Sequence, residues 1–501
     1  MDGVEVMKKF DSVVIGAGPG GYVAAIRLAQ LGKKTALIDR DNLGGTCLNW
    51  GCIPSKALIH AAHLYETMHH SAKEMGFSFK DLDLDMKKLV QWKDGVVQKL
   101  TGGIGGLCKR HGIEVFMGTA EFKSAKQLDL TLNDSSKKET IEFDQAIIAT
   151  GSETASLPGL AIDGKKFITS KEALNLQEIP KKMILIGGGV IGLELGCFYS
   201  MLGTKVTILE YANQLLPGTD LDLVKVVEKS MVAKDAEIFT GFKVQGGEIK
   251  GKNAVVKGTA ADGKAMSFEA DVVLVSVGRR PFTKFLSPEK TGIKLDPKGF
   301  VTVNKSLQTS VPHIYAIGDV TPGPALAHRA SHEAVIAAAH MAGDKFAQVD
   351  YRVIPGAIFT EPEIASVGLT ETEAKAKGLD VKIGKFPFAA LGRALANQAS
   401  DGFCKLIGDA KTNDLLGMHV VGKDAGNIIA EGALAIEMGA SIEDLAMTIH
   451  THPTYPEAIM EAAESYFGHA IHVYQPGHSK KEASSSAPPK IGGGAKEIRP
   501  S

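Results

Sequence analysis

One pattern occurs twice in this chain and constrains its fold more than any other feature. It consists of a short apolar strand, a G-x-G-x-x-G turn, a helical stretch and a second apolar strand that ends in an acid. The first copy has glycines at Gly16, Gly18 and Gly21 and its acid at Asp39. The second copy has glycines at Gly187, Gly189 and Gly192 and its acid at Glu210. In both copies the acid follows the first glycine by 23 residues.

This pattern is typical of dinucleotide-binding βαβ units. The glycines permit a tight turn and bring a pyrophosphate close to a helix N-terminus, while the acid accepts a hydrogen bond from a ribose hydroxyl. A single copy is weak evidence, because glycine-rich turns without a ligand also occur. Two copies in full βαβ context predict an α/β protein with two Rossmann-like dinucleotide-binding domains. The length of 501 residues leaves room for about one further domain.

Cys47 and Cys52 lie just after the first copy, five positions apart. On a regular helix this separation would be about 7.5 Å, beyond the roughly 7 Å Cα limit for a disulfide. We therefore expect Cys47 to lie before a helix or in its distorted first turn, with Gly51 and Pro54 supplying the irregularity. The nearby helix N-terminus favours a thiolate. The alternatives are two buried cysteines that never meet, or a metal pair, although no other Cys or His cluster has zinc spacing.

The composition of the chain limits the cellular compartment and the kinds of partner that can be expected. Five cysteines in 501 residues are too few for a secreted disulfide framework, and Cys108, Cys197 and Cys404 are isolated enough to be small core residues. The chain shows no apolar signal core, so a cytoplasmic location is expected. The formal net charge of −1 gives no electrostatic case for nucleic acid or a membrane surface. Residues 183–203 are apolar but are interrupted by three glycines and Glu194, which predicts strand, turn and helix rather than a membrane span.

Two dinucleotide sites flanking one dithiol imply an electron relay. Glu210 would repel a 2′-phosphate, so the second site should prefer NAD(H) to NADP(H). The first site must then hold a carrier that exchanges electrons with thiols, which a flavin can do.

Three further segments are expected to complete the two dinucleotide-binding domains. Residues 147–152 are expected to form a buried strand that ends in a turn at Gly151, and residues 272–278 repeat this at Gly278. Residues 313–319 are expected to form a strand that ends near Asp319. The alternative role for Asp319 is to cap the following helix.

One short segment contains both a histidine and a carboxylate, and prolines restrict its conformation. In it, Glu457 follows His452 by five residues. Such a pair can act as base and orienter, because the carboxylate fixes the imidazole tautomer and raises its basicity. The alternatives are metal ligation by His450 and His452, or two polar surface residues.

Together these motifs resemble the flavin-dependent pyridine nucleotide-disulfide oxidoreductase family over residues 8–470, and within it the branch that oxidises protein-bound dihydrolipoamide with NAD⁺. The resemblance rests on residues 44–56, on residues 187–194, on Gly318-Asp319, on Ala327-His328 and on residues 452–457. It implies an FAD-binding domain over residues 1–152 and 281–350, an NAD-binding domain over 153–280 and an α+β dimerisation domain over 351–471. The remaining residues, 472–501, are rich in Ser, Pro, Gly and Lys and cannot bury a core, so a disordered tail is expected there.

The resemblance also implies roles for single residues. Cys47 would exchange with substrate and Cys52 would contact the flavin, while His452, held by Glu457, would act as acid–base across a dimer interface. Lys56 would lie near the reactive edge of the isoalloxazine, with a solvated helix residue as the alternative. The expected cofactor contacts are Gly16, Gly18, Gly21, Asp39, Lys56, Ala120, Gly151, Gly187, Gly189, Gly192, Glu194, Glu210, Gly278, Asp319 (to the ribityl chain) and Ala327.

The chain departs from the family at two places: Asp39 stands where Glu is usual, and Tyr455-Pro456 replaces the commonest Leu-Ser. The expected partners are a second copy of the chain, the lipoyl domains and core of 2-oxo acid dehydrogenase complexes (or of the glycine cleavage complex), and a small dithiol substrate. Nucleic acid and membrane insertion are not expected. A reductase of another small disulfide and a redox-inactive scaffold subunit remain as alternatives.

Overall fold

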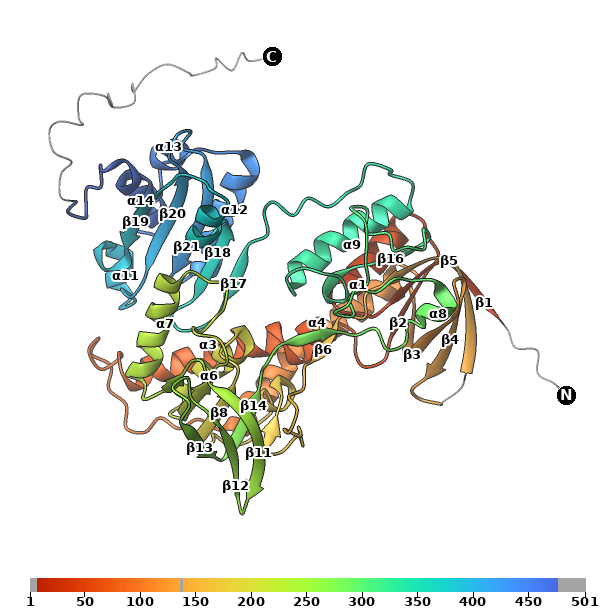
Figure 1. The fold of residues 1–501 in the computed structure, drawn as a ribbon, viewed down its shortest axis with the longest axis horizontal. Helices are drawn as coiled ribbons and strands as arrows, with labels where there is room; N and C mark the ends of the chain where they lie inside the picture. The colour runs from red at the N-terminus through yellow and green to blue at the C-terminus, as the bar shows by residue number, and fades with distance from the viewer. Residues whose placement is uncertain (1–6, 136–137, 476–501) are drawn as a thin grey trace, which may run out of the picture. The chain divides into compact units, whose positions relative to one another are not determined.

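The structure is a computed structural model that describes residues 7–135 and 138–475. The chain separates into two compact units, residues 1–364 and residues 365–501 (Figure 1). Most of the predicted tail, residues 476–501, lies outside the described residues. The boundaries expected between FAD-binding and NAD-binding segments stay a prediction.

The first unit contains a parallel sheet in the order β3-β2-β1-β5-β16, to which β4 is added through antiparallel pairing with β3 and β5. These strands are β1 (Lys8–Ile15), β2 (Thr35–Asp39), β3 (Glu114–Ser124), β4 (Gln127–Leu132), β5 (Lys138–Ile148) and β16 (Ile314–Ala316). The two strands of the first glycine pattern are neighbours in register, with Val13 opposite Ala36.

A second parallel sheet in the same unit repeats this plan in the order β10-β9-β8-β14-β7. Its strands are β7 (Phe167–Ile168), β8 (Lys182–Ile186), β9 (Lys205–Leu209), β10 (Glu237–Phe239) and β14 (Val272–Val275). An antiparallel sheet of β11 (Lys243–Lys250), β12 (Asn253–Thr259) and β13 (Ala265–Ala270) accompanies it. The predicted pair of Rossmann-like folds is therefore confirmed.

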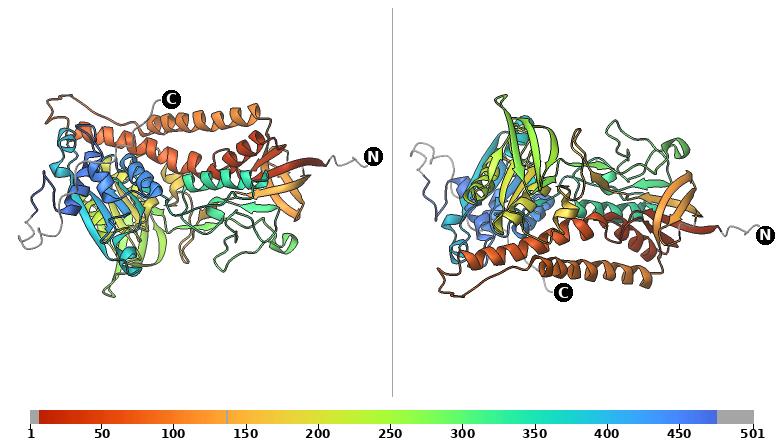
Figure 2. Two further views of the ribbon diagram at one scale, coloured as in Figure 1. Left: turned by 90° about the horizontal axis from the view of Figure 1, so that it is seen from above. Right: turned by 90° about the horizontal axis from the view of Figure 1, so that it is seen from below.

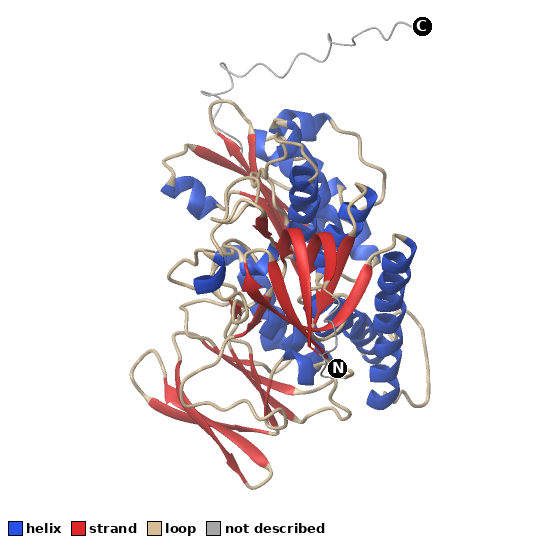
Figure 3. Cartoon of the chain, turned by 90° about the vertical axis from the view of Figure 1, so that its right-hand side faces the viewer, coloured by secondary structure: helices blue, strands red, loops and turns tan. Residues whose placement is uncertain are grey.

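Helices cover one face of the first sheet, as Figure 3 shows with helices in blue and strands in red. Val14, Leu37 and Ile147 on that face pack with Leu28 of α1 (Pro19–Gln30) and Ala337 of α9 (Ala327–Met341) in one buried cluster. The other face packs with apolar residues of β3, β4 and β5. The sheet is thus buried on both sides, as expected for parallel strands.

Helix α3 (Cys52–His69) begins at the second cysteine and runs beside α4 (Met86–Arg110), whose N-terminus is capped by Asp85 (Figure 2). It also contacts α6 (Val190–Met201), the helix of the second glycine pattern. The remaining elements of the unit are α2 (Gly45–Trp50), β6 (Ser152–Thr154), α5 (Ser170–Ala173), α7 (Leu221–Ala233), β15 (Arg279–Pro281), α8 (Pro288–Thr291), η1 (Gly318–Val320) and β17 (Gly356–Ile358).

The apolar stretch of residues 183–203 forms β8, a turn and α6, as predicted. Among the residues that the structure describes, no helix is both long enough and apolar enough to span a membrane.

The second unit is an antiparallel sheet with helices, in the strand order β18-β21-β20-β19. Its elements are β18 (Ile364–Gly368), α10 (Glu371–Ala376), β19 (Val381–Pro387), η2 (Phe388–Ala390), α11 (Gly392–Ala396), β20 (Phe403–Asp409), β21 (Leu415–Val421), α12 (Ala425–Met438), α13 (Ile442–Met447) and α14 (Glu457–Phe467). Helix α14 packs closely on β19, because a Cβ on Gly384 would lie 2.1 Å from the Ala462 carbonyl oxygen. The predicted α+β character of this domain is confirmed.

The first residues of the predicted tail are held against α14. Gln475 Nε2 donates to the Ser465 carbonyl at 3.0 Å, and His472 Nδ1 pairs with Glu461 at 2.5 Å. The structure therefore describes the first four residues of the segment that was expected to form the tail, 472–475.

Candidate redox and nucleotide-binding site

The outer glycines, meaning the first and last of each pattern, are needed because backbone carbonyl oxygens occupy the space where a Cβ would lie. A Cβ on Gly16 would lie 2.2 Å from the Ala149 carbonyl oxygen, and one on Gly187 would lie 2.5 Å from that of Ser276. Both glycines have positive φ, +102° and +104°. A Cβ on Gly21 or Gly192 would lie 1.7 Å or 2.4 Å from the carbonyl oxygen of the first glycine of its own pattern. No side chain fits at these positions.

The middle glycines are different, because a Cβ on Gly18 or Gly189 would meet nothing within 4 Å. Each is the N-cap of the helix that follows, α1 or α6, and neither helix start receives a side-chain cap. Backbone N–H groups of a first helical turn need an acceptor from outside the helix. Open space beside such donors is suited to a phosphate group.

The two acids have matching contacts. Asp39 accepts hydrogen bonds from Ala17 N at 2.6 Å and Asp41 N at 2.8 Å. Glu210 accepts from Gly188 N and Ala212 N, both at 2.6 Å. Each acid thus binds the second residue of its own glycine pattern, and the shorter Asp39 reaches the same group as Glu210. Burial raises the pKa of Asp39, against the hydrogen bond from Ala17.

The two cysteines lie on separate helices, with Cys47 in α2 and Cys52 as the first residue of α3. Gly51 forms the break between the helices, and a Cβ there would lie 2.8 Å from the Thr46 carbonyl oxygen. Cys47 therefore precedes the helix of Cys52, as the spacing predicted, and Pro54 lies in the first turn of α3.

Both cysteines are free thiols, and a hydrogen bond between their side chains is the largest influence on the pKa of each. This bond, with burial, raises the pKa of Cys47 well above its usual value. The same bond lowers the pKa of Cys52 to about 7, and Lys56 adds to the effect while burial and Glu194 oppose it. The cysteines meet, so the alternative of two unconnected buried thiols is wrong. Within residues 7–135 and 138–475, no group of three or more His, Cys, Asp or Glu residues could hold a metal.

Lys56 is not a solvated helix residue. Its Nζ donates to both carboxylate oxygens of Glu194, at 2.9 and 2.7 Å, and lies 4.5 Å above the Phe359 ring. Glu194 Oε1 also accepts from Phe359 N at 3.0 Å. The Glu194 side chain is only 7% exposed. The pair joins the dithiol helix α3 to α6.

Asp319 contacts Ser152, the first residue of β6, and does not cap a helix. Its Oδ2 accepts from Ser152 Oγ at 2.6 Å, whereas α9 begins at Ala327 with Leu326 as N-cap. Arg279 Nε donates to Ser152 Oγ at 2.7 Å, and its Nη2 donates to the Ser152 carbonyl at 2.6 Å.

Arg279 was missed as a functional candidate. Burial lowers its pKa, while the charges of Asp319 and Cys52 oppose this shift, so the guanidinium lies close to the thiol. The only signal in the sequence was its position directly after Gly278, at the end of a predicted strand.

The remaining predicted cofactor contacts fall into two groups, those at turns or at a helix start and one inside the core of the sheet. Gly151 and Gly278 have φ of +69° and +109°, flank the β6–β15 pair and have open space around their Cβ positions. Ala327 opens α9, which lacks a side-chain cap. Ala120, by contrast, is 8% exposed and lies in the core of the sheet, paired with Leu130.

The second unit assembles the predicted histidine pair. His452 Nδ1 lies 2.7 Å from Glu457 Oε1, and Glu457 Oε2 accepts from Thr454 N at 2.6 Å. Burial raises the pKa of Glu457, but the hydrogen bonds from Thr454 and His452 outweigh it and lower the pKa overall. The His452 side chain is 77% exposed, so its other ring nitrogen is accessible.

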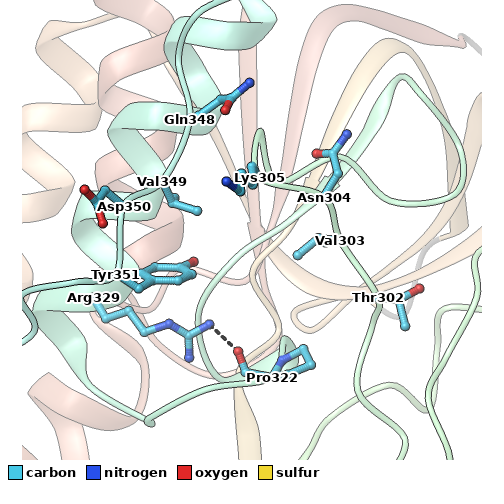
Figure 4. Close-up of a pocket in the computed structure, with 10 residues that line it drawn as sticks. All are labelled: Thr302, Val303, Asn304, Lys305, Pro322, Arg329, Gln348, Val349, Asp350 and Tyr351. Carbon is cyan, nitrogen blue, oxygen red and sulfur yellow. Dashed lines mark hydrogen bonds between the residues drawn. The ribbon is translucent and has the colours of Figure 1, made fainter. Parts of the chain in front are cut away.

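A pocket of about 760 Å³ lies elsewhere in the first unit (Figure 4). Its lining includes Lys305, Arg329 and Tyr351 but none of the predicted site residues. The Arg329 guanidinium is buried and already bonded to Glu333, Thr321 and two backbone carbonyls. The pocket therefore offers no unused buried charge to a ligand.

Comparisons with known proteins agree with this arrangement. The family model described as pyridine nucleotide-disulphide oxidoreductase matches residues 10–334, and that of the family's dimerisation domain matches residues 354–463. Dihydrolipoyl dehydrogenases of Geobacillus stearothermophilus and Thermus scotoductus are each 47% identical to the chain. The alignments cover 92% and 93% of this chain and 97% and 99% of those proteins.

Two solved structures have the same architecture. LpdA from Mycobacterium tuberculosis superposes with a TM-score of 0.83 at 27% identity, covering 91% of this chain and 99% of that one. The HOCl-induced flavoprotein disulfide reductase RclA from Escherichia coli gives a TM-score of 0.80 at 28% identity, with 91% and 99% covered. With its duplicated glycine patterns, paired thiols and matched family models, the chain belongs to the pyridine nucleotide-disulphide oxidoreductase family.

Proposed function

We propose that this chain is a dihydrolipoyl dehydrogenase, which oxidises dihydrolipoamide and reduces NAD⁺ through a Cys47–Cys52 disulfide and FAD. The observation that carries the proposal is the hydrogen-bonded thiol pair, which lies on α2 and α3 between two uncapped glycine turns. The relatives that bear this name align with almost the whole chain.

The chain's residues suit both cofactors. Gly16, Gly18 and Gly21 with Asp39 would hold FAD, whose ribityl chain would bond Asp319. Gly187, Gly189 and Gly192 with Glu210 would hold NAD(H), and Glu210 would disfavour a 2′-phosphate. When bound, FAD accepts the electron pair of the dithiol and NAD⁺ carries it away as hydride.

The chemistry of the thiols follows from their unequal pKa values. His452 takes a proton from one thiol of dihydrolipoamide, since only the thiolate is a nucleophile. That thiolate attacks Cys47 in the oxidised protein, forms a mixed disulfide and releases Cys52 as a thiolate. The second substrate thiol then displaces Cys47 and passes its proton to the departing sulfur, so Cys47 leaves as a thiol while His452 keeps the first proton. The substrate becomes the cyclic disulfide, and the protein gains two electrons as Cys47 thiol and Cys52 thiolate.

Charged groups around Cys52 support its role next to the flavin. The Lys56 ammonium stabilises the Cys52 thiolate, and Glu194 holds that ammonium in place. Arg279 adds a second positive charge and is itself oriented by Ser152. These residues would retain the negative charge on Cys52 until the electrons leave.

We further propose a homodimer built on residues 354–463, the part that matches the dimerisation domain. Its substrate would be carried by the lipoyl domains of 2-oxo acid dehydrogenase complexes. We also propose a cytoplasmic location, which is supported by the buried, isolated positions of Cys108, Cys197 and Cys404.

A steady-state assay with free dihydrolipoamide and either nicotinamide tests the proposal. We expect yellow protein that reduces NAD⁺ far better than NADP⁺. Cys47→Ser and Cys52→Ser should each abolish lipoamide turnover yet leave oxidation of NADH by dyes. Turnover of another small disulfide in preference to lipoamide would favour the alternative reductase, and a protein with no disulfide activity would favour the scaffold.

A further inference from the structure

The loop between α13 and α14 carries a second histidine that the mechanism above does not use. His450 lies two residues before His452, but its side chain is 5% exposed, compared with 77% for His452. The loop thus turns one imidazole inward against α12 and the other outward. Figure 1 shows α12, α13 and α14 together in blue.

Both ring nitrogens of His450 face acceptors. Nδ1 lies 3.0 Å from the Thr448 carbonyl oxygen, and Nε2 lies 2.9 Å from Glu431 Oε1 on α12. A carbonyl and a carboxylate can only accept, so both nitrogens must donate at once, and only the imidazolium can do this. In agreement, the hydrogen bond to Glu431 raises the pKa of His450; burial opposes this shift, and Thr448 and Glu457 add to it.

The charged groups around His450 come from each neighbouring element. Glu431 lies on α12, and Glu457 begins α14 and contributes to the raised pKa. On the sheet side, Cys404 of β20 is buried, and burial and the Glu431 charge raise the pKa of its thiol, so it stays neutral. Two carboxylates therefore act on the imidazolium, Glu431 through a hydrogen bond and Glu457 through its charge.

His450 also acts on Glu457. The charge of His450 is among the causes that lower the pKa of Glu457, after the hydrogen bonds from Thr454 and His452. Glu457 must be ionised to accept from His452, and it must be correctly placed to orient that ring. His450 contributes to both conditions, the first by its charge and the second by binding the loop to α12.

We infer that His450 is a positioning residue for the His452–Glu457 pair: bound to Glu431 and to the Thr448 carbonyl, it fixes the loop on α12 and so places Glu457 to orient the His452 ring. This inference rests on the proposed function, in which His452 removes the substrate proton. His450 itself touches neither substrate nor cofactor in that scheme.

The first measurement compares kcat for dihydrolipoamide in the wild type, His452→Gln and His450→Gln. Loss of a general base costs about 10²–10⁴-fold, and a positioning residue should cost less, so we expect about a tenfold fall for His450→Gln. The KM for dihydrolipoamide, the FAD content and NADH–dye oxidation should be unchanged. Glu431→Gln, which keeps the side-chain shape, should lower kcat in the same way and carries the test if His450→Gln does not fold.

A matched control is His469→Gln. His469 is 57% exposed and lies 3.9 Å from Glu464, in the same unit but at the far end of α14. A surface pair of this kind contributes little, so its loss should not change kcat.

The decisive readout is non-additivity. If His450 acts through His452, the double variant His450→Gln/His452→Gln should be no slower than His452→Gln alone. Multiplied losses, or a wild-type kcat in both His450→Gln and Glu431→Gln, would overturn the inference. If instead the wild type does not turn over dihydrolipoamide, or His452→Gln is fully active, the proposed function fails independently of His450.

Discussion

The unequal pKa values of the two thiols follow from one hydrogen bond. A thiol that donates to its neighbour stabilises the neighbour as a thiolate and becomes harder to ionise itself. Cys47 is the donor, because the shared hydrogen bond raises the pKa of Cys47 and lowers that of Cys52. Cys47 is thereby the sulfur that leaves as a neutral thiol, and Cys52 is the one that retains charge.

A pH titration of single-cysteine variants tests this assignment. In Cys47→Ser the hydroxyl can still donate, so the Cys52 pKa should remain at about 7. The long-wavelength absorbance of a thiolate beside an oxidised flavin should then appear as the pH rises through this value. In Cys47→Ala the largest cause of the lowered pKa is gone, and the midpoint should move to higher pH. Equal midpoints would show that the hydrogen bond does not set the Cys52 pKa.

The selectivity for nicotinamide depends on Glu210. Glu210→Ala should reduce the preference for NADH over NADPH, measured as the ratio of kcat/KM values, by about 1–3 kcal/mol, the scale of a charged hydrogen bond. Because Glu210 also binds Gly188 N and Ala212 N, truncation will loosen the turn. Glu210→Gln keeps the shape and removes the charge, and it should retain more NADH activity. A wild type that prefers NADPH would contradict the argument.

Local residue patterns predicted most of the site, and long-range partners were missed. Spacing alone indicated both glycine turns, both acids and the break at Gly51. Arg279 and Phe359 were not recognised, because they lie 227 and 307 positions from Cys52 in the chain and carry no motif of their own. Only the packing of α3 on α6 brings Glu194, Lys56 and Phe359 together.

At the scale of elements, the two glycine turns show why two kinds of glycine are needed. The outer glycines serve the fold, since carbonyl oxygens occupy the space of their Cβ atoms. The middle glycines have free space around their Cβ positions, and we propose that they serve the ligand. The sequence pattern marks all of them equally, and only the surrounding backbone separates the two classes.

A matched pair of substitutions in the second turn tests this division. Gly189→Ala should lower the free energy of unfolding by about 1 kcal/mol or less, as expected at an N-cap. It should nevertheless raise the KM for NADH while FAD stays bound. Gly192→Ala places a Cβ 2.6 Å from Ser276 Oγ and 2.4 Å from a carbonyl oxygen, so it should lower stability by about 1–3 kcal/mol or more. Thermal unfolding and NADH kinetics on the same samples distinguish the two effects. Equal destabilisation by both would contradict the division.

At the scale of the whole molecule, the chain contains the Rossmann-like fold twice, followed by an α+β domain of a different fold. The strand orders β3-β2-β1-β5-β16 and β10-β9-β8-β14-β7 correspond in space; β4 joins the first sheet by antiparallel pairing, and the separate antiparallel sheet β11-β12-β13 accompanies the second. This duplication was predictable, since each copy carries its own local signal. The second unit has no repeated motif, so its sheet order could be anticipated only from the resemblance.

The thiols lie in the first unit and the histidine pair in the second, which makes the dimer testable by complementation. If each active site takes its thiols from one subunit and His452 from the other, neither the Cys47→Ser nor the His452→Gln homodimer has an intact site. A mixed dimer then has one site with both defects and one with none. Co-refolding the two inactive variants at equal concentration gives about half mixed dimers by random pairing, so about a quarter of the wild-type sites should be active.

The measurement is lipoamide turnover per FAD, which should rise from about a quarter of the wild-type value in the mixture to about half once two different affinity tags have separated the mixed dimers. The control is a mixture of Cys47→Ser with Cys52→Ser, because both defects fall on the same half of the site. In that mixed dimer both sites lack a thiol, so no activity should return. Recovery in the first mixture and none in the second requires that the site be shared between subunits. Inactive mixed dimers of Cys47→Ser and His452→Gln, with normal FAD content, would instead place thiols and histidine in the same subunit.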